Sequence, residues 1–219
     1  MKLTYKELEI ELELAGLLAV EELVLTQGLN CHAGLTLKIL IEEEQRDELV
    51  TMSSDAGVTV RELEKTNGQV VFRGKLETVS ARRENGLFYL YLEAWSYTMD
   101  WDRVKKSRSF QNGALTYMEV AQRVLSGYGQ SGVTDHATGG ACIPEFLLQY
   151  EESDWVFLRR LASHFGTYLL ADATDACGKV YFGIPEISYG TVLDRQDYTM
   201  EKDMLHYARA VSYTHLRAH

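Results

Sequence analysis

The stretch that decides the fold is Asn85-Gly86-Leu87-Phe88-Tyr89-Leu90-Tyr91-Leu92. Asn-Gly is the strongest short signal for a β-hairpin, because a type I′ turn needs a positive φ at both of its central residues. The six residues that follow are apolar on both faces of an extended strand, which is typical of a central or barrel strand. The sequence therefore predicts a hairpin that leads into a buried strand over Leu87–Trp95.

Period-two patterns fill the chain before this hairpin. Four aliphatic residues alternate strictly with four glutamates, which predicts a half-buried strand with a solvated glutamate row: Leu8, Ile10, Leu12 and Leu14 against Glu7, Glu9, Glu11 and Glu13. Further strand-like runs are Glu21–Thr26, Gly34–Ile41, Val58–Leu63, Val70–Gly74 and Leu76–Ala81. A second hairpin turn is predicted at Asn67-Gly68, and a short polar helix over Glu42–Leu49. The first hundred residues thus read as an antiparallel meander or barrel.

Helical periodicity begins after residue 110. Asn112-Gly113 predicts a turn, and Thr116-Tyr117-Met118-Glu119 matches the capping box that satisfies two otherwise unbonded amides. The apolar residues of this helix are Tyr117, Val120, Ala121 and Val124. We expect the helix to end with Gly127 at the C′ position, and a loop to follow over Gly127–Gly140.

A second helix is predicted to start at Ser153 as its N-cap and to end at Gly166. Its apolar stripe consists of Trp155, Leu158, Leu161, Ala162 and Phe165. Two strands then follow, over Thr167–Ala171 and Val180–Ile184. The predicted fold class is α+β and mainly β: two small antiparallel barrel-like modules, with two or three helices inserted in the C-terminal half.

We expect two domains, over residues 1–100 and 101–210. The last nine residues, Val211–His219, match the translation of a common transposase sequencing adapter. We therefore interpret 211–219 as an artefact, and expect the natural chain to continue past Ala210. His215 and His219 then carry no functional information.

The net charge and hydropathy of the sequence limit the classes of partner that we expect. The chain has 22 basic and 32 acidic residues, a net charge of −10, and a polyanion would be repelled by that field. The basic cluster Arg103-Lys105-Lys106-Arg108 is interpreted as a solvated loop, so no nucleic-acid partner is expected. There is neither an 18-residue apolar run nor a Sec-type signal peptide. We expect synthesis in the bacterial cytoplasm and no membrane insertion by this segment.

The three cysteines, Cys31, Cys142 and Cys177, are too far apart for a C-x-x-C pair. We expect reduced, mostly buried thiols and neither a disulfide framework nor a thiolate zinc site.

Two sequence motifs resemble functional sites but lack the flanking residues or elements that those sites need. Gly127-Tyr128-Gly129-Gln130-Ser131-Gly132 matches G-x-G-x-x-G, but a dinucleotide site needs a strand before the motif and a helix after it, and here that order is reversed. Ser131 lacks the final glycine of a nucleophile elbow. No cofactor is predicted.

The charged residues around the second helix are interpreted as structural. Glu151, Glu152 and Asp154 complement the positive end of the helix, and His164 lies in its last turn. Asp154 and His164 lie nearly 15 Å apart along the helix, so they cannot share a metal ion. Cys31-His32 has no third ligand in view. The sequence therefore predicts no catalytic, cofactor-binding or metal-ligating residue.

Trp155, Phe157, Leu158 and Phe165 could form a partner-binding stripe, with Phe157 off the main stripe. An apolar helix face is more often core, and that is the favoured reading.

A family resemblance rests on four ordered segments. They are Leu29-Asn30-Cys31-His32-Ala33, Phe72-Arg73-Gly74, Ser107-Arg108-Ser109-Phe110-Gln111 and Gln149-Tyr150-Glu151-Glu152-Ser153-Asp154-Trp155-Val156-Phe157-Leu158-Arg159-Arg160-Leu161. Together they resemble the phage late-control gene D protein and VgrG family, the central hub of contractile tails and injection machines. The resemblance covers residues 1 to about 210.

The resemblance implies a structural protein without turnover. In that family three copies form a ring that joins the tail tube to the spike, so a homotrimer with tube and spike partners is implied, in a virion tail or an injection particle. A spike or lytic domain follows in longer relatives.

Two alternatives stay open. One is a tail-associated cell-wall-degrading enzyme fragment, for which a glycosidase needs two carboxylates about 5–10 Å apart. The other is a stand-alone carbohydrate- or protein-binding β module, which the 13 tyrosines and three tryptophans favour.

Overall fold

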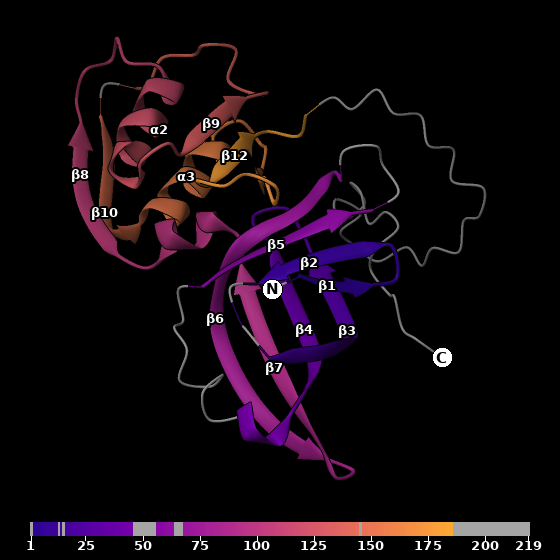
Figure 1. Cartoon of the computed structure of the whole chain (residues 1–219). Coiled ribbons are helices and arrows are strands. Elements are labelled where there is room, and N and C mark those ends of the chain that lie inside the picture. The colour runs from indigo at the N-terminus through magenta and orange to yellow at the C-terminus, as the bar shows by residue number, and fades with distance from the viewer. Residues whose placement is uncertain are drawn as a thin grey trace, which may run out of the picture.

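The computed structural model describes residues 2–12, 14, 16–45, 56–63, 68–144 and 146–185. The expected tail Val211–His219 and part of the predicted polar helix therefore lie outside the described residues. In Figure 1 the strands of the first half form a curved sheet, and the helices and short strands of the second half lie at one end of it.

Seven strands form the sheet of the first half. They are β1 (Lys2–Tyr5), β2 (Leu8–Leu12), β3 (Leu17–Thr26), β4 (Gly34–Ile41), β5 (Gly57–Glu62), β6 (Val70–Glu84) and β7 (Leu87–Trp95). Their order is β1-β2-β5-β6-β7-β4-β3, and every neighbouring pair is antiparallel. The end strands β1 and β3 lie against each other without a hydrogen-bonded ladder, so the sheet is a nearly closed barrel. This agrees with the expected barrel.

The hairpin predicted at Asn85-Gly86 is present between β6 and β7, with φ of 50° and 87° at its two central residues. The runs predicted over Val70–Gly74 and Leu76–Ala81 are a single strand, β6, whose pairing with β7 shifts between Leu76 and Thr78. Such a bulge bends the strand and helps a sheet to curl, and the two predicted runs are the parts of β6 on either side of the bend.

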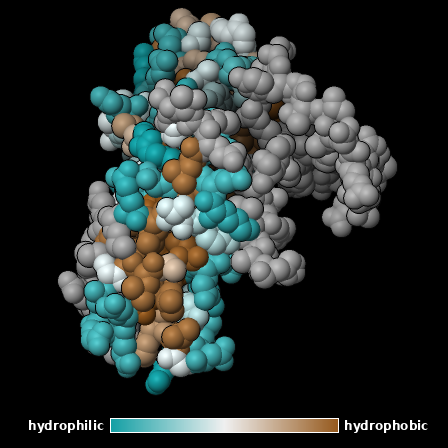
Figure 2. Space-filling view, turned by 45° about the vertical axis from the view of Figure 1, so that its right-hand side comes forward, coloured by the Kyte–Doolittle hydropathy of each residue, from teal (hydrophilic) through white to brown (hydrophobic). Residues whose placement is uncertain are grey.

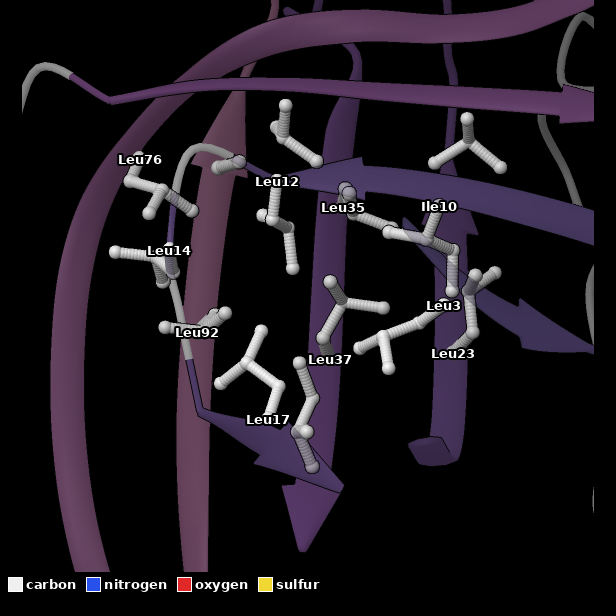
Figure 3. Close-up of a cluster of buried hydrophobic side chains, with 14 of the residues drawn as sticks. Leu3, Ile10, Leu12, Leu14, Leu17, Leu23, Leu35, Leu37, Leu76 and Leu92 are labelled. Atoms are coloured by element: carbon white, nitrogen blue, oxygen red, sulfur yellow. The ribbon is translucent and has the colours of Figure 1, made fainter. Parts of the chain in front are cut away.

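Aliphatic side chains fill the barrel. Leu8, Ile10 and Leu12 are at most 1% exposed, while Glu11 on the opposite face of β2 is exposed, which confirms the period-two prediction. Figure 3 draws 14 of these side chains, pointing toward one another, and the ten that it labels come from β1, β2, β3, β4, β6, β7 and the β2–β3 connection.

The second half carries two α-helices and two small sheets. Its elements are β8 (Lys105–Phe110), α2 (Tyr117–Leu125), β9 (Gly132–Asp135), β10 (Leu147–Ser153), α3 (Asp154–Ser163), β11 (Leu169–Ala171) and β12 (Lys179–Phe182). β10 pairs with β8, and β11-β12-β9 form the other sheet. Three short 3₁₀ helices are η1 (Glu43–Gln45), η2 (Tyr97–Asp102) and η3 (Ser126–Tyr128).

The predicted fold class is confirmed: the chain is mainly β, with its α-helices in the C-terminal half. One detail of the second half differs. β9 and β12 pair in parallel, whereas antiparallel strands only were predicted. The two strands are far apart in the chain, so no local sequence pattern determines their relative direction.

Both predicted helix starts are confirmed. Thr116 and Glu119 form the reciprocal capping box of α2, and the Ser153 hydroxyl accepts from the Val156 amide at the start of α3. α2 ends at Leu125 with Ser126 as its C-cap, so Gly127 occupies the predicted C′ position. The chain continues into η3, however, and the residue with a positive φ is Gly129, at 71°. The loop expected over 127–140 was wrong in part, because it contains strand β9.

Candidate functional site

The loop between β3 and β4 joins the barrel to the second half. Leu29 forms an isolated antiparallel bridge with Leu170 of β11. The Asn30 amide donates to Leu169 O at 2.7 Å, and the Leu169 amide donates to Asn30 Oδ1 at 2.9 Å. Asn30 has φ of 57°, a left-handed conformation that asparagine tolerates better than most residues. One loop thus pairs with a strand whose hydrogen-bonded residue lies 139 positions further along the chain.

Two other hydrogen bonds support this junction. Gln27 Nε2 donates to Ala171 O at 2.8 Å, and the Arg73 amide of β6 donates to Ala173 O at 2.7 Å. Ala173 itself packs within the hydrophobic cluster of the barrel. The backbone around residues 169–173 is therefore bonded to two separate parts of the barrel.

His32 lies in the same loop and packs against the second half. Its ring faces the indole of Trp155, with centroids 4.1 Å apart. Nδ1 lies 2.9 Å from Thr98 Oγ1. Nε2 is buried without a hydrogen-bond partner, 3.6 Å from Asp102 Oδ2, which is ion-pair distance but long for a hydrogen bond. Burial lowers the pKa of His32, and the nearby Asp102 carboxylate only partly offsets this effect.

Asp154, the first residue of α3, lies at the centre of a buried charge cluster. Its side chain is fully buried and accepts from Lys106 Nζ at 2.7 Å, from Tyr128 OH at 2.7 Å, from Gln149 Nε2 at 2.8 Å, and from Arg108. Burial alone would raise the pKa of Asp154. The hydrogen bonds from Arg108, Lys106, Gln149 and Tyr128 outweigh burial, so this pKa lies below its usual value.

The cluster overturns the expected solvated loop over Arg103-Lys105-Lys106-Arg108. Residues 105–110 form strand β8, and alternation turns Lys106 and Arg108 inward onto Asp154. Arg103, just before this strand, pairs with Glu77 and Asp100. The prediction of a solvated loop was wrong because charges at a period of two are also compatible with a strand that turns one face inward.

The other carboxylates and His164 lie apart. Glu152 pairs with Arg160 of α3, and Glu151 lies exposed in a bulge of β10. His164 caps the far end of α3, where its Nδ1 lies 2.9 Å from Tyr117 OH. Asp154 and His164 thus occupy opposite ends of one helix, as predicted. The glycine motif at 127–132 follows helix α2 and precedes strand β9, which is the reverse of a dinucleotide site.

The expectation of mostly buried thiols was wrong. Cys31 and Cys142 are exposed and Cys177 is partly exposed, because all three lie outside regular elements, and all are free. Within the described residues no three His, Cys, Asp or Glu side chains are grouped to hold a metal ion.

No described helix combines the length and apolar character needed to cross a bilayer.

Trp155 and Phe157 belong to the core of the second half. Trp155 is 1% and Phe157 0% exposed, and Phe157 stacks on Phe110 with centroids 6.0 Å apart. The core reading of this stripe is therefore correct, and it includes Phe157, which helical periodicity alone had left off the main stripe.

The sequence profile of the phage tail baseplate hub (GPD) family matches residues 35–183, which is well over half of the chain and runs from the barrel to the last strand of the second half. The chain belongs to the phage tail baseplate hub family. No curated protein matches its sequence significantly.

Solved structures share the fold of this hub protein. The 43 kDa tail protein of prophage MuSo2 from Shewanella oneidensis aligns with a TM-score of 0.64 at 15% identity, over 80% of this chain and 52% of the other. A tail protein of Neisseria meningitidis MC58 aligns with a TM-score of 0.56 at 15% identity, over 72% and 44%. An E. coli type VI secretion component, described as similar to the T4 tail proteins gp27 and gp5, aligns with a TM-score of 0.53 at 13% identity, over 78% and 48%. The chain thus spans about half the length of these structures.

Proposed function

We propose that this hub protein is a structural subunit that assembles as a trimeric ring and joins the tail tube to the spike of a contractile phage tail or a related injection system. The observation that carries the proposal is the family match over residues 35–183, which includes the barrel strands β4 to β7 and the second half. We further propose that residues 1–100 and 101–210 form the two modules of the hub. They correspond in the described residues to two separate hydrophobic clusters.

The junction supports a mechanical role. The β3–β4 loop and β6 bond to the backbone around residues 169–173, so the two halves are held together by main-chain hydrogen bonds as well as by packing. A ring subunit that holds two other components in register needs this kind of rigidity. The virion tail or the injection particle is the proposed location.

The charge cluster argues against the alternative of a cell-wall-degrading enzyme. That alternative needs carboxylates that are available to a substrate, and the acidic residues grouped at the start of α3 are Glu151, Glu152 and Asp154. Asp154 is buried among its four donors, and Glu152 is paired with Arg160. We therefore propose that Asp154 and Glu152 stabilise the fold and do not turn over a substrate.

The proposal is tested by assembly. The chain is purified with and without tube and spike proteins from the same genome, and its mass is measured by light scattering after size exclusion. We expect the mass of three 24.9 kDa chains and co-elution with at least one of the two partners. A strict monomer that binds neither of them would overturn the proposal.

A further inference from the structure

His32 carries a polar atom that the junction of the two halves leaves unsatisfied. Its side chain is 9% exposed, and its Nε2 is buried without a hydrogen-bond partner. Its other ring nitrogen, Nδ1, lies 2.9 Å from the hydroxyl of Thr98 in η2. A buried polar atom that has lost its water and gained no partner costs free energy. A state in which this ring reaches water therefore competes with the packed one.

The charged groups that face the ring act in opposite directions. Asp102 of η2, 3.6 Å from Nε2, favours a protonated imidazole, and Arg159 of α3 disfavours it. Asp102 is held where it lies, because its other carboxylate oxygen accepts from the hydroxyl of Ser153, the N-cap of α3. Burial is the largest effect, and it lowers the pKa of His32. The packed position of the ring thus disfavours the charged form.

The polar groups around His32 form a chain that returns to its own loop. Thr98 Oγ1 lies 2.9 Å from Ser96 Oγ, which accepts from the Ala33 amide at 3.2 Å. Asp102, His32 and Thr98 follow the order of a catalytic triad, but Thr98 is 0% exposed, so a substrate cannot reach its hydroxyl. The arrangement is therefore suited to controlling the position of the β3–β4 loop and not to catalysis.

The other contacts of this loop with the second half are mostly hydrogen bonds. Asn30 and Leu169 exchange two of them, and Gln27 donates to Ala171 O. The two hydrophobic clusters are separate, and among the described residues of the second half only Ala173 packs in the barrel cluster. On the face shown in Figure 2, the exposed apolar surface of the barrel is a band between hydrophilic borders. Water can replace hydrogen bonds of this kind, so the loop can leave the second half while both cores stay packed.

We propose that this contact is sensitive to pH: protonation of His32 releases the β3–β4 loop from α3 and β11 under mildly acidic conditions, while both halves stay folded. The released imidazolium is hydrated and lies away from Arg159, so the cost of burying its charge disappears. The covalent connection near residue 100 and the hydrogen bond from Arg73 to Ala173 O then still join the halves. The inference concerns the single chain and does not rest on its assembly.

Hydrogen exchange of the full chain, followed amide by amide by NMR, tests the proposal. The reporters are the amides of Asn30 and Leu169, which donate across the junction. The controls are the amides of Leu76 and Val120, each bonded within its own half. All protection factors are corrected for the intrinsic exchange rate at each pH. We expect the reporters to be less protected than the controls, because the junction opens without global unfolding.

Acid should lower the protection of the reporters. One proton taken up on opening changes the ratio of open to closed molecules by at most about tenfold for each pH unit. We expect a loss of at least about threefold between pH 7.5 and 5.5, across the ordinary histidine pKa of about 6.5. A rise in protection on acidification would mean that the charged ring pairs with Asp102 in place, and would overturn the proposal. Equal protection of reporters and controls would also overturn it, because the junction would then open only when the whole chain unfolds.

Three variants identify the titrating group. His32→Gln should abolish the acid-induced loss of protection. His136→Gln is the matched control, because His136 also contacts an aromatic ring, that of Tyr181 at 5.8 Å, but lies outside the junction, and it should keep the loss. Asp102→Asn should enlarge the loss, since it removes the carboxylate that favours the protonated ring. A loss that persists in His32→Gln, or that disappears in Asp102→Asn, would assign the acid response to another group and overturn the role of His32.

Discussion

His32 and Trp155 lie ring against ring, with centroids 4.1 Å apart, although one belongs to a barrel loop and the other to helix α3. The imidazole is buried and its pKa is lowered, so the folded protein favours the neutral ring. The unfolded chain then binds more protons than the folded one below the ordinary histidine pKa of about 6.5.

Stability should therefore be complete above this pH and fall as the pH drops from about 7 toward 5. Urea midpoints across this range check the slope. His32→Gln should flatten it, whereas His136→Gln, at a histidine outside the junction, should not. If the urea midpoint of the His32 variant depends on pH as strongly as that of wild type, His32 is not the cause of the pH dependence.

Asp154→Asn should destabilise the protein strongly. The substitution leaves Lys106 and Arg108 beside a neutral amide, and breaking a buried ion pair costs about 3–5 kcal/mol. We expect the lower end, about 3 kcal/mol, because the two cations are themselves about 30% exposed. Denaturant unfolding measures the loss. Glu151→Gln, at an exposed neighbouring position, should stay within about 0.5 kcal/mol of wild type.

Gly74→Ala should destabilise the barrel. A Cβ built at Gly74 would lie 2.2 Å from Trp95 O and 2.9 Å from Phe72 Cζ, so the β6 and β7 backbones would have to separate. Overpacking of this kind costs about 1–3 kcal/mol. Gly132→Ala is the matched control, because nothing lies within 4 Å of its added Cβ. Equal melting temperatures for the two variants would contradict the close approach.

Thr116→Ala should cost about 1 kcal/mol, because Thr116 and Glu119 cap the start of α2 reciprocally. Thr116→Ser keeps the hydroxyl and should retain most of the stability. Thermal unfolding of the pair isolates the cap, and a serine variant as unstable as the alanine variant would point to packing of the methyl group instead.

Much of the barrel could be predicted because its signals are local. The Asn85-Gly86 turn and the apolar run after it specify one hairpin, and the alternation over 8–12 specifies which face of β2 is buried. The capping residues Thr116 and Ser153 fixed both helix starts for the same reason.

The junction and the charge cluster could not be predicted because their partners are distant in sequence. Nothing near Asn30 indicates that it bonds to Leu169, and Lys106 lies beside Asp154 because β10, which leads into α3, pairs with β8. A lysine or arginine read from sequence is usually solvated. That alternate cations of β8 point inward can be recognised only once the buried carboxylate that they contact, Asp154, is known. Strand β10 was missed because its bulge at Glu151 interrupts the period of two.

The Asn30–Leu169 exchange determines how a load would travel through the subunit. The loop that holds β11 is also the connection between two adjacent barrel strands, β3 and β4. Tension on the second half is thus divided between two strands of the barrel rather than carried by the single covalent connection near residue 100. The covalent connection near residue 100 and the β3–β4 loop both join the barrel to the second half, so neither one serves as a hinge while the other is intact.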